Sequence, residues 1–236
     1  AMTSSKNSTR ILDIQKRVVS CRLCPRLVEW RDDVAATKRA AFKDEDYWGK
    51  PVPAFGDPEA RLLIVGLAPA AHGANRTGRM VTGVRSGDWL YRALHRAGVA
   101  NQATSTDRQD GLALRDGFIS AAVRCAPPKN KPTTEERDAC QGFLQEELAA
   151  MPELGVMVAL GKFAFDQLWR ILKDAGEDLP IPRPRFHHGL EVLIRPDLTL
   201  LASFHPSQQN TFTGKLTEEM FDQIWTRAQA LTALGP

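Results

Sequence analysis

The sequence lacks several features that would assign a protein to a class at first sight. No apolar run approaches the roughly 18 residues that a membrane-spanning helix needs, so we expect no membrane partner. The first ten residues, AMTSSKNSTR, contain no apolar core of a secretion signal, which predicts a cytoplasmic protein. Neither G-x-G-x-x-G nor G-x-x-x-x-G-K-[ST] occurs, which argues against a dinucleotide-binding or P-loop enzyme. The chain also has no internal repeat and no low-complexity segment.

A strong excess of one charge is missing too. The 31 Lys and Arg residues against 28 Asp and Glu leave a net charge of +3, which permits a nucleic-acid partner without requiring one. The distribution is more informative than the total, because basic residues gather beside the loops that follow two predicted strands. These residues are Arg76, Arg79, Arg85, Lys129 and Lys131. Their clustering favours a partner that carries phosphate groups.

The length and the hydrophobic content of 43% suit one large domain, and we predict a single domain over residues 1–236. Residues 1–60 of this domain are expected to form helices and a loop that carry two of the four cysteines. Four short apolar segments that alternate with helical patterns are predicted strands: 62–65, 118–123, 156–160 and 198–204. This alternation predicts an α/β fold with three layers, α/β/α, around a central four-stranded parallel sheet. Residues 191–194 are a candidate minor strand.

Helical patterns fill the segments between these strands. The predicted helices cover residues 8–19, 27–41, 86–97 and 161–172, a segment after Thr133, and a last segment that begins at about residue 217. Ser86 is the predicted N-cap of the helix over 86–97. Thr133 and Glu136 form a predicted capping box at the start of their helix.

The stretch RLLIVGLAPAAHGANRTGRMVTG, residues 61–83, is the segment around which the chain is organised. Its first part is a predicted buried strand, and Gly66 lets the backbone leave the sheet. The loop that follows combines small residues with the polar side chains of His72, Asn75 and Arg76. A loop of this kind at the carboxyl end of a parallel strand is a frequent ligand site. A Gly/Ala-rich connector without a ligand is the alternative.

The four cysteines, Cys21, Cys24, Cys125 and Cys140, form a C-x2-C pair and a C-x14-C pair. Disulfides are not expected in a cytoplasmic protein. One turn, one strand end and one helix can bring four thiolates together, and that ligand set suits a structural zinc ion or a [4Fe–4S] cluster. The third alternative is that Cys125 and Cys140 are ordinary core thiols and that the C-x2-C pair arises by chance.

Several motifs occur together along the chain. They are GLAPA and HGANRTGR after the first strand, the four cysteines at this spacing, RCAPPKNKP after the second strand, and HPSQQNTFTG after the fourth. In this order and combination they resemble the uracil-DNA glycosylase superfamily, and within it family 5, the B-type iron–sulfur glycosylases of bacteria and archaea. The resemblance runs from about Ile11 to Trp225. It implies a monofunctional DNA-repair enzyme that flips uracil, hypoxanthine or other damaged bases out of DNA and hydrolyses the N-glycosidic bond.

The resemblance also implies roles for individual residues. A structural [4Fe–4S] cluster is implied on Cys21, Cys24, Cys125 and Cys140. His205 is the implied catalytic residue, which donates a hydrogen bond to the departing base anion; in isolation, an H-P-S tripeptide would more often cap a loop or a helix. The implied substrate-binding residues are Gly66, Leu67, Ala68, Pro69, Ala70, His72, Asn75, Arg76, Val81, Asn130 and Ser207. The backbone of residues 66–70 would border the base and position a water, Asn130 would offer its amide to the base edge, and Ser207 would contact phosphate or the minor groove.

Three positions depart from the pattern of related families. Leu67 stands where other families carry an acidic or Asn side chain that activates water, so the first motif would act through its shape and backbone. Val81 lies where a related iron–sulfur family stacks a Phe on uracil, and Val84 follows T-G where many family 5 members carry Asp. These departures predict a wider, less polar pocket with relaxed base selectivity.

Two other functions stay open from the sequence. A non-catalytic module with a structural metal site could bind single-stranded or damaged DNA without cleaving it, and Leu67 and Val84 favour this alternative. A hydrolase of free nucleotides or a redox protein on the same scaffold is the third alternative, and the missing nucleotide motifs argue against it. The leading prediction is a monomer that acts on DNA containing uracil or deaminated bases, cytoplasmic and associated with the nucleoid.

Overall fold

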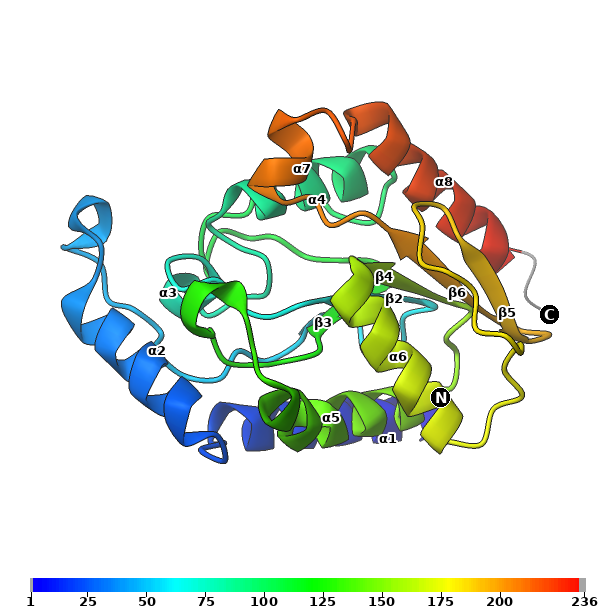
Figure 1. Ribbon diagram of the computed structural model, residues 1–236, viewed down its shortest axis with the longest axis horizontal. Coiled ribbons are helices and arrows are strands. Elements are labelled where there is room, and N and C mark those ends of the chain that lie inside the picture. The colour runs from blue at the N-terminus through cyan, green and yellow to red at the C-terminus, as the bar shows by residue number, and fades with distance from the viewer. Residues whose placement is uncertain (1, 234–236) are drawn as a thin grey trace.

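A mixed sheet of six strands forms the centre of the molecule in the computed structural model, which describes residues 2–233 (Figure 1). The strands lie in the order β1-β3-β2-β4-β6-β5. Their bounds are β1 (Phe55–Gly56), β2 (Leu62–Gly66), β3 (Gly117–Ala121), β4 (Val156–Leu160), β5 (Glu191–Arg195) and β6 (Leu198–Ser203). The four inner strands are parallel, whereas β1 and β5 pair antiparallel at the two edges. The predicted four-stranded parallel sheet is therefore confirmed, with an added strand at each edge.

The burial of each strand explains how visible it is in the sequence. Every residue of the four parallel strands is buried, which produces the continuous apolar runs that predict them. The predicted minor strand is β5, whose residues alternate between exposed and buried as expected for an edge strand with one covered face. Strand β1 lies in a segment predicted as loop, because two residues are too few to show a period.

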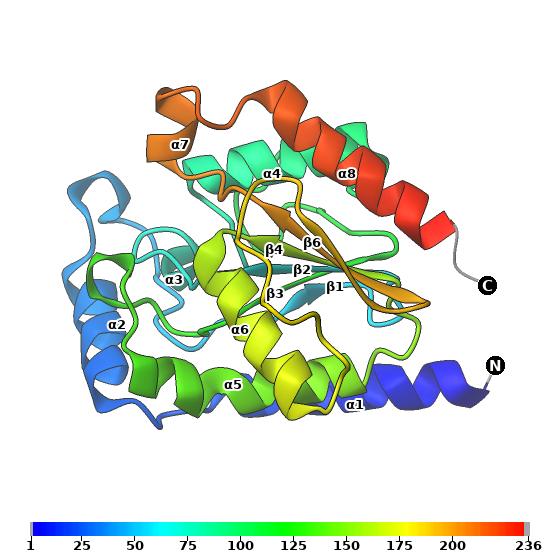
Figure 2. The same cartoon turned by 45° about the vertical axis from the view of Figure 1, so that its right-hand side comes forward.

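Helices cover both faces of the sheet. Helices α1 (Met2–Val19), α5 (Thr134–Ala149) and α6 (Lys162–Asp174) lie on one face, and α4 (Arg85–Arg96) and α8 (Glu218–Ala233) on the other (Figure 2). Side chains of β2 alternate between the two layers: Leu63 and Val65 belong to the core of the first face, and Leu62 and Ile64 to that of the second. The predicted three-layer α/β/α fold is confirmed.

Helix α2 (Pro25–Thr37) lies to one side of these layers, at the left of Figure 1. It ends earlier than predicted, because Lys38 at its C-cap takes a left-handed φ of 60°. A short 3-10 turn, η1 (Ala40–Phe42), follows it. Three further short segments appear within predicted loops: α3 (Ala74–Thr77), η2 (Pro128–Asn130) and α7 (Gln208–Phe212).

Two helix starts test the capping predictions. The capping box of α5 is confirmed, because Thr133 Oγ1 accepts from the Glu136 N–H at 3.2 Å and Glu136 Oε1 accepts from the Thr133 N–H at 2.8 Å. The prediction of Ser86 as an N-cap is wrong. Helix α4 begins at Arg85 with Val84 as its N-cap residue, which provides no side-chain cap.

The topology determines where a ligand can bind. The chain passes from β2 to its neighbour β3 and then crosses back to β4 on the other side of β2. The loops that leave β2 and β4 therefore turn in opposite directions at the carboxyl ends of these strands, which opens a crevice at that edge of the sheet. Within residues 2–233, no helix combines the length and the apolar character that crossing a bilayer requires.

Candidate active site

A cavity of about 470 Å³ opens at the carboxyl ends of the parallel strands. Strands β2, β3, β4 and β6 contribute their last residues or the loops that follow them, so segments far apart in the sequence meet there. The predicted site residues that line this cavity are Gly66, Leu67, Ala68, Pro69, Ala70, His72, Val81, Asn130, His205 and Ser207. The structure thus brings together most of the residues that the motifs single out.

His205 follows β6 and faces the cavity. The surrounding protein atoms lower the pKa of its imidazole to about 4, so the ring is neutral at physiological pH. Its carbonyl oxygen accepts from Asn210 Nδ2 at 2.9 Å, which holds the backbone of the loop. Neither ring nitrogen has a hydrogen-bond partner within residues 2–233, so the imidazole can donate to a ligand in the cavity.

His72 is held by a hydrogen bond from outside the central loop. Tyr47 Oη lies 2.8 Å from His72 Nδ1 and also accepts the Arg39 N–H at 3.2 Å. Burial lowers the pKa of His72, and the charges of Arg39 and Arg76 lower it further. His72 is therefore a second neutral imidazole at the cavity.

Val81 lines the cavity in a strained backbone conformation. Its φ of 51° lies in the left-handed region, which a β-branched residue rarely adopts. The neighbouring residues enforce it: Thr77 Oγ1 donates to the Thr82 carbonyl at 3.2 Å, and the buried Arg79 Nε donates to Thr82 Oγ1 at 3.2 Å. Arg79 is held in turn by a buried ion pair with Asp110. The second half of the central loop is therefore rigid rather than a flexible connector.

Two predicted substrate-binding residues lie outside the lining of the cavity. Asn75 on α3 is 1% exposed, and both polar atoms of its side chain are buried without a hydrogen-bond partner within the described residues. Arg76 uses its whole guanidinium within the protein: Nε donates to the His72 carbonyl at 2.7 Å, and Nη1 pairs with Glu45 at 2.7 Å. Its plane lies over the Phe42 ring, with Cζ 3.9 Å from the centroid. Arg76 thus joins the segment after α2 to the central loop.

Asn130 reaches the cavity from η2, in the proline-rich segment after β3. Lys129 and Asn130 both have positive φ values, 55° and 56°, and Asn tolerates this region better than most residues. Arg26 at the start of α2 holds the segment, because its Nη2 donates to the Lys131 carbonyl at 3.0 Å and to Glu136 Oε1 at 2.6 Å. The position of Asn130 therefore depends on α2 and α5.

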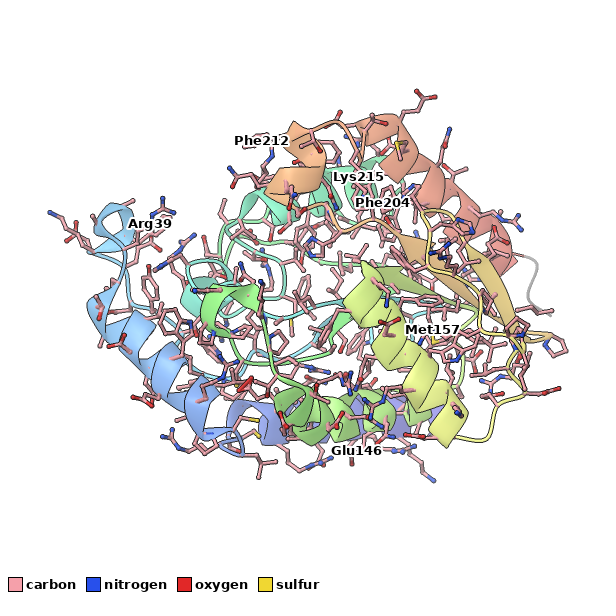
Figure 3. All side chains as sticks on the ribbon, viewed as in Figure 1. Arg39, Glu146, Met157, Phe204, Phe212 and Lys215 are labelled. Atoms are coloured by element: carbon pink, nitrogen blue, oxygen red, sulfur yellow. The ribbon has the colours of Figure 1, made fainter. Side chains whose placement is uncertain are left out.

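Sequence reasoning missed several residues that line the cavity. Arg39 and Phe42 come from the segment after α2, and Arg85 comes from the first turn of α4. Figure 3 shows Arg39 on the segment after α2 and Phe212 on α7, at separate margins of the molecule. Arg85 lies over the Phe212 ring, with Cζ 4.1 Å from the ring centroid. The basic character of Arg39 and Arg85 was visible in the sequence, but nothing in it placed Phe42 at a site.

A larger hollow, about 580 Å³, lies elsewhere on the molecule. It includes residues that flank the amino end of β2, among them Arg61, whose guanidinium pairs with Asp116 at 2.6 Å. None of the predicted site residues lines it. The cavity that contains His205 is therefore the candidate active site.

Comparison with known proteins assigns the family. The family model of the uracil DNA glycosylase superfamily matches residues 53–229. A type-5 uracil-DNA glycosylase of Mycobacterium bovis is 49% identical over 225 residues, which cover 95% of this chain and 82% of the relative. Proteins of the same name from Thermus thermophilus and Pyrobaculum aerophilum are 49% and 45% identical, over 92% of this chain and over 96% and 92% of their own lengths. The chain belongs to the type-5 uracil-DNA glycosylase family.

The four cysteines of this type-5 family member come from separate elements and line one narrow cavity. Cys21 and Cys24 lie in the turn between α1 and α2, Cys125 follows β3, and Cys140 is on α5. All four are free thiols. Among residues 2–233, no three or more His, Cys, Asp or Glu side chains are arranged to hold a metal ion as they stand. Because a χ1 rotation moves a Cys sulfur by several ångströms, the shared cavity is the better guide to what this set can bind.

Burial raises the pKa values of Cys125 and Cys140, as expected for thiols in a closed site. It raises the pKa of Cys125 to about 11, against the lowering effect of the nearby Arg31 guanidinium. It raises the pKa of Cys140 to about 12, against the charge of Arg124. Without a metal, Cys125 and Cys140 are therefore neutral thiols, and binding a metal centre would release their protons.

Two buried arginines flank the cysteine cavity. Arg31 and Arg124 are 2% and 1% exposed. Arg31 Nε and Arg124 Nη1 are buried and have no hydrogen-bond partner within the described residues. Each guanidinium is paired through another nitrogen, Arg31 with Asp32 and Arg124 with Glu147, but a buried N–H group without an acceptor is costly, and an anion within reach would supply that acceptor. The cavity thus fits a negatively charged centre on four thiolates.

Proposed function

We propose that this protein excises uracil from DNA by hydrolysing the N-glycosidic bond. The cavity at the strand ends, with the neutral donor His205 facing it, is the observation that carries the proposal. Three relatives that are 45–49% identical over most of the chain bear the name type-5 uracil-DNA glycosylase, which supports the same activity here. The enzyme class is then a monofunctional glycosylase that leaves an abasic site in DNA.

The proposed chemistry follows from charge development in the transition state. Breaking the bond between sugar and base leaves positive character on the sugar and a negative charge on the departing base. A neutral imidazole that donates an N–H to this base stabilises the anion without adding a full positive charge to the buried site. His205 has this protonation state, and its free ring nitrogens supply the donor. His205 is therefore the proposed catalytic residue.

The first motif contributes its backbone and its shape. Residues 66–70 leave β2 at the cavity, and the small residues Gly66, Ala68 and Ala70 among them allow a flat base to approach the main chain. Among the described residues that line the cavity, none is Asp or Glu. By the resemblance, Leu67 stands where other families carry the water-activating group, and Val84 stands where many family 5 members carry Asp. We propose that the main chain orients the water, which attacks the forming sugar cation without a general base.

The remaining predicted residues would bind the nucleotide. Asn130 would offer its side-chain amide to the base edge, Ser207 would contact the DNA backbone, and His72 would add a second neutral donor at the rim. Both Asn75 and Arg76 have side chains outside the lining, and Arg76 would act indirectly, by holding the central loop. The apolar walls at Leu67 and Val81 suit damaged bases of different shapes, such as hypoxanthine, as well as uracil.

The four cysteines are proposed to hold a [4Fe–4S] cluster. The shared cavity and the unpartnered buried donors of Arg31 and Arg124 support a dianionic tetrathiolate centre at this place. The cluster would have a structural role, since it would join the turn between α1 and α2 to β3 and α5. With this tie, residues 1–236 would form a single domain, which we expect to act on DNA as a monomer. Iron and sulfide analysis separates the cluster from a zinc ion.

Base release tests the proposed function directly. Duplexes with a single uracil, hypoxanthine or thymine are incubated with the protein and then treated with hot alkali, which cuts abasic sites. We expect cleavage at uracil and hypoxanthine and none at thymine. No cleavage by folded protein that contains iron would contradict the proposal. If such protein binds uracil-containing DNA tightly with strong salt dependence, the alternative of a non-catalytic binding module would replace it.

The His205→Ala variant tests the catalytic role. Losing one donor to a developing anion should slow base release by about tenfold or more. The visible absorption of the cluster and the melting temperature should not change, because the His205 ring makes no hydrogen bond within residues 2–233. His205→Gln, which keeps an N–H donor, is the matched control and should retain part of the rate. Full activity of His205→Ala would remove this residue from the mechanism.

A further inference from the structure

A buried polar network connects the candidate active site with the cysteine cavity. Its centre is Glu147 on α5, which is fully buried. Glu147 Oε1 accepts from Ser120 Oγ at 2.7 Å and pairs with the Arg124 guanidinium, and Oε2 accepts from Gln15 Nε2 at 2.8 Å. Ser120 belongs to β3 and is part of the lining of the active-site cavity. One end of the network is thus the floor of that cavity.

Arg124 is the other end of the network. Its Nη2 donates to Ser120 Oγ at 2.6 Å, and its Nε donates to the Ala121 carbonyl at 3.0 Å. Arg124 also belongs to the lining of the cysteine cavity, and its Nη1 is buried without a partner in the described chain. Arg124 therefore contacts the floor of one cavity through its guanidinium and is itself part of the lining of the other.

Helix geometry explains why the two cavities are joined here. Cys140 and Glu147 are seven residues apart on α5, which places them on one face of the helix about 10 Å from each other. Ser120 and Cys125 are at the two ends of the segment that runs along this face. The segment is held to α5 by Glu147 at one end and would be held by the shared metal centre at the other. Arg124 lies between these two attachments.

We propose that Arg124 is a positioning residue that couples the four-cysteine centre to the floor of the active-site cavity. This inference rests on the proposed function and on the proposed cluster. Arg124 balances two anions, Glu147 and the thiolate centre, and its contacts with Ser120 and the Ala121 carbonyl fix the end of β3 against the bound nucleotide. The centre would thereby shape the active site without touching the DNA.

The charges of the network give a signature that a purely structural role would not produce. In Glu147→Gln the positive charge of Arg124 is no longer balanced, so the more negative, reduced state of the cluster is favoured and its reduction potential should rise. In Arg124→Gln the charge of Glu147 is unbalanced, and the potential should fall. The double variant removes both charges, so its potential should return close to that of the unaltered protein.

The experiment measures the midpoint potential and the Fe–S stretching frequencies of each iron-loaded variant without DNA. Asp110→Asn is the control, since the partly buried Asp110 is also the ion-pair partner of a buried arginine, Arg79, and Arg79 belongs to the lining of neither cavity. Opposite shifts in the two single variants, with no shift in the control, support the proposal. The proposal would be overturned if both single variants had the same potentials and frequencies as the control. It would also be overturned if the protein contained no iron and sulfide.

The double variant also keeps the test decisive if a single variant fails to fold. Either single variant leaves a buried charge without its partner, whereas the double variant leaves none. Its base release on uracil-containing DNA should fall about tenfold, the size of effect expected when outer-shell support is lost. Unchanged base release would overturn the positioning role. If the potentials shift as expected but the unaltered protein releases no base, the proposed function is contradicted. The coupling between Arg124 and the cysteine centre then still stands.

Discussion

At the scale of single residues, partly buried histidines contribute to the response to acid. Burial lowers the pKa of His205 to about 4 and also lowers the pKa values of His72 and His188. A histidine with a lowered folded-state pKa stabilises the fold fully above its unfolded pKa of about 6.5 and loses that contribution as pH falls through the folded value. All three histidines therefore lower the free energy of unfolding as the pH falls.

We expect the free energy of unfolding to decrease steadily between pH 6.5 and pH 4. Denaturant titrations at a series of pH values would measure this decrease. In His205→Gln, which carries no titrating group at the position, the decrease should be smaller. Base release should stay level from pH 6.5 to 8, because His205 does not change its protonation state there. A rate that rises or falls tenfold across this range would contradict the assignment of a neutral donor.

Asn130 offers a second prediction at this scale. Its φ of 56° would penalise most replacements, whereas Gly takes this conformation without strain. Asn130→Gly therefore removes the side-chain amide and leaves the backbone in place. Base release should slow by up to about tenfold, the effect of one lost hydrogen bond, while the melting temperature changes little.

Asn130→Asp is the complementary variant. It has the same shape and also tolerates positive φ, but its carboxylate repels the departing anion, so it should be slower than Asn130→Gly. Single-turnover rates on a uracil-containing duplex would give this ranking. Equal rates for both variants and the unaltered protein would show that Asn130 does not contact the base.

At the scale of elements, the start of α4 combines a capping position with the active-site cavity. Val84 is the N-cap residue, provides no side-chain acceptor, and is part of the cavity lining. Asp or Asn at this position would cap the helix and stabilise the fold by about 1 kcal/mol. The loss of the Val methyl groups would offset part of this gain. The two replacements have nearly the same shape, but only Asp carries a negative charge and can accept a proton from water.

Val84→Asp should therefore increase base release by tenfold or more, as expected of an added general base. Val84→Asn should leave the rate near that of the unaltered protein, with a similar melting temperature. Single-turnover base release on uracil and on hypoxanthine would measure both. Equal rates for the Asp and Asn variants would show that water activation does not limit this enzyme.

At the scale of the whole molecule, the cysteine centre would hold α2 and the segment of Asn130 to the body of the protein. Arg26, two residues after Cys24, bonds to the Lys131 carbonyl and to Glu136. Loss of the centre should therefore loosen residues 20–50 and 125–131 together. Losing a few kcal/mol in a chain of this size should lower the melting temperature by about 10 °C.

The Cys24→Ser variant tests this expectation. It should lose the visible absorption of the cluster and show faster amide hydrogen exchange in those two segments. Ser20→Ala is the control, because Ser20 is exposed and precedes Cys21, and within the described part of the chain its hydroxyl bonds only to the carbonyls of Lys16 and Arg17. A variant without iron that keeps its melting temperature would contradict a structural centre.

The sequence by itself determined the central sheet, the capping box at Thr133, and the motifs around Gly66 and His205. These features are local: a fully buried strand must be apolar along its whole length, and a capping box needs two residues three positions apart. The sequence also held the family resemblance, because the motifs keep their order. It did not determine where α2 ends or which residue caps α4, since those depend on the φ of Lys38 and on packing near Val84.

Only the tertiary structure decided which polar side chains face the ligand cavity. Arg76 and Asn75 lie in the central loop, yet their side chains are committed to packing and internal contacts, while Arg39 and Phe42 reach the cavity from the segment after α2. The link from Ser120 through Glu147 to Arg124 joins residues up to 27 positions apart. Sequence patterns report the period of one element, whereas such contacts depend on how several elements pack, and that information exists only in the folded chain.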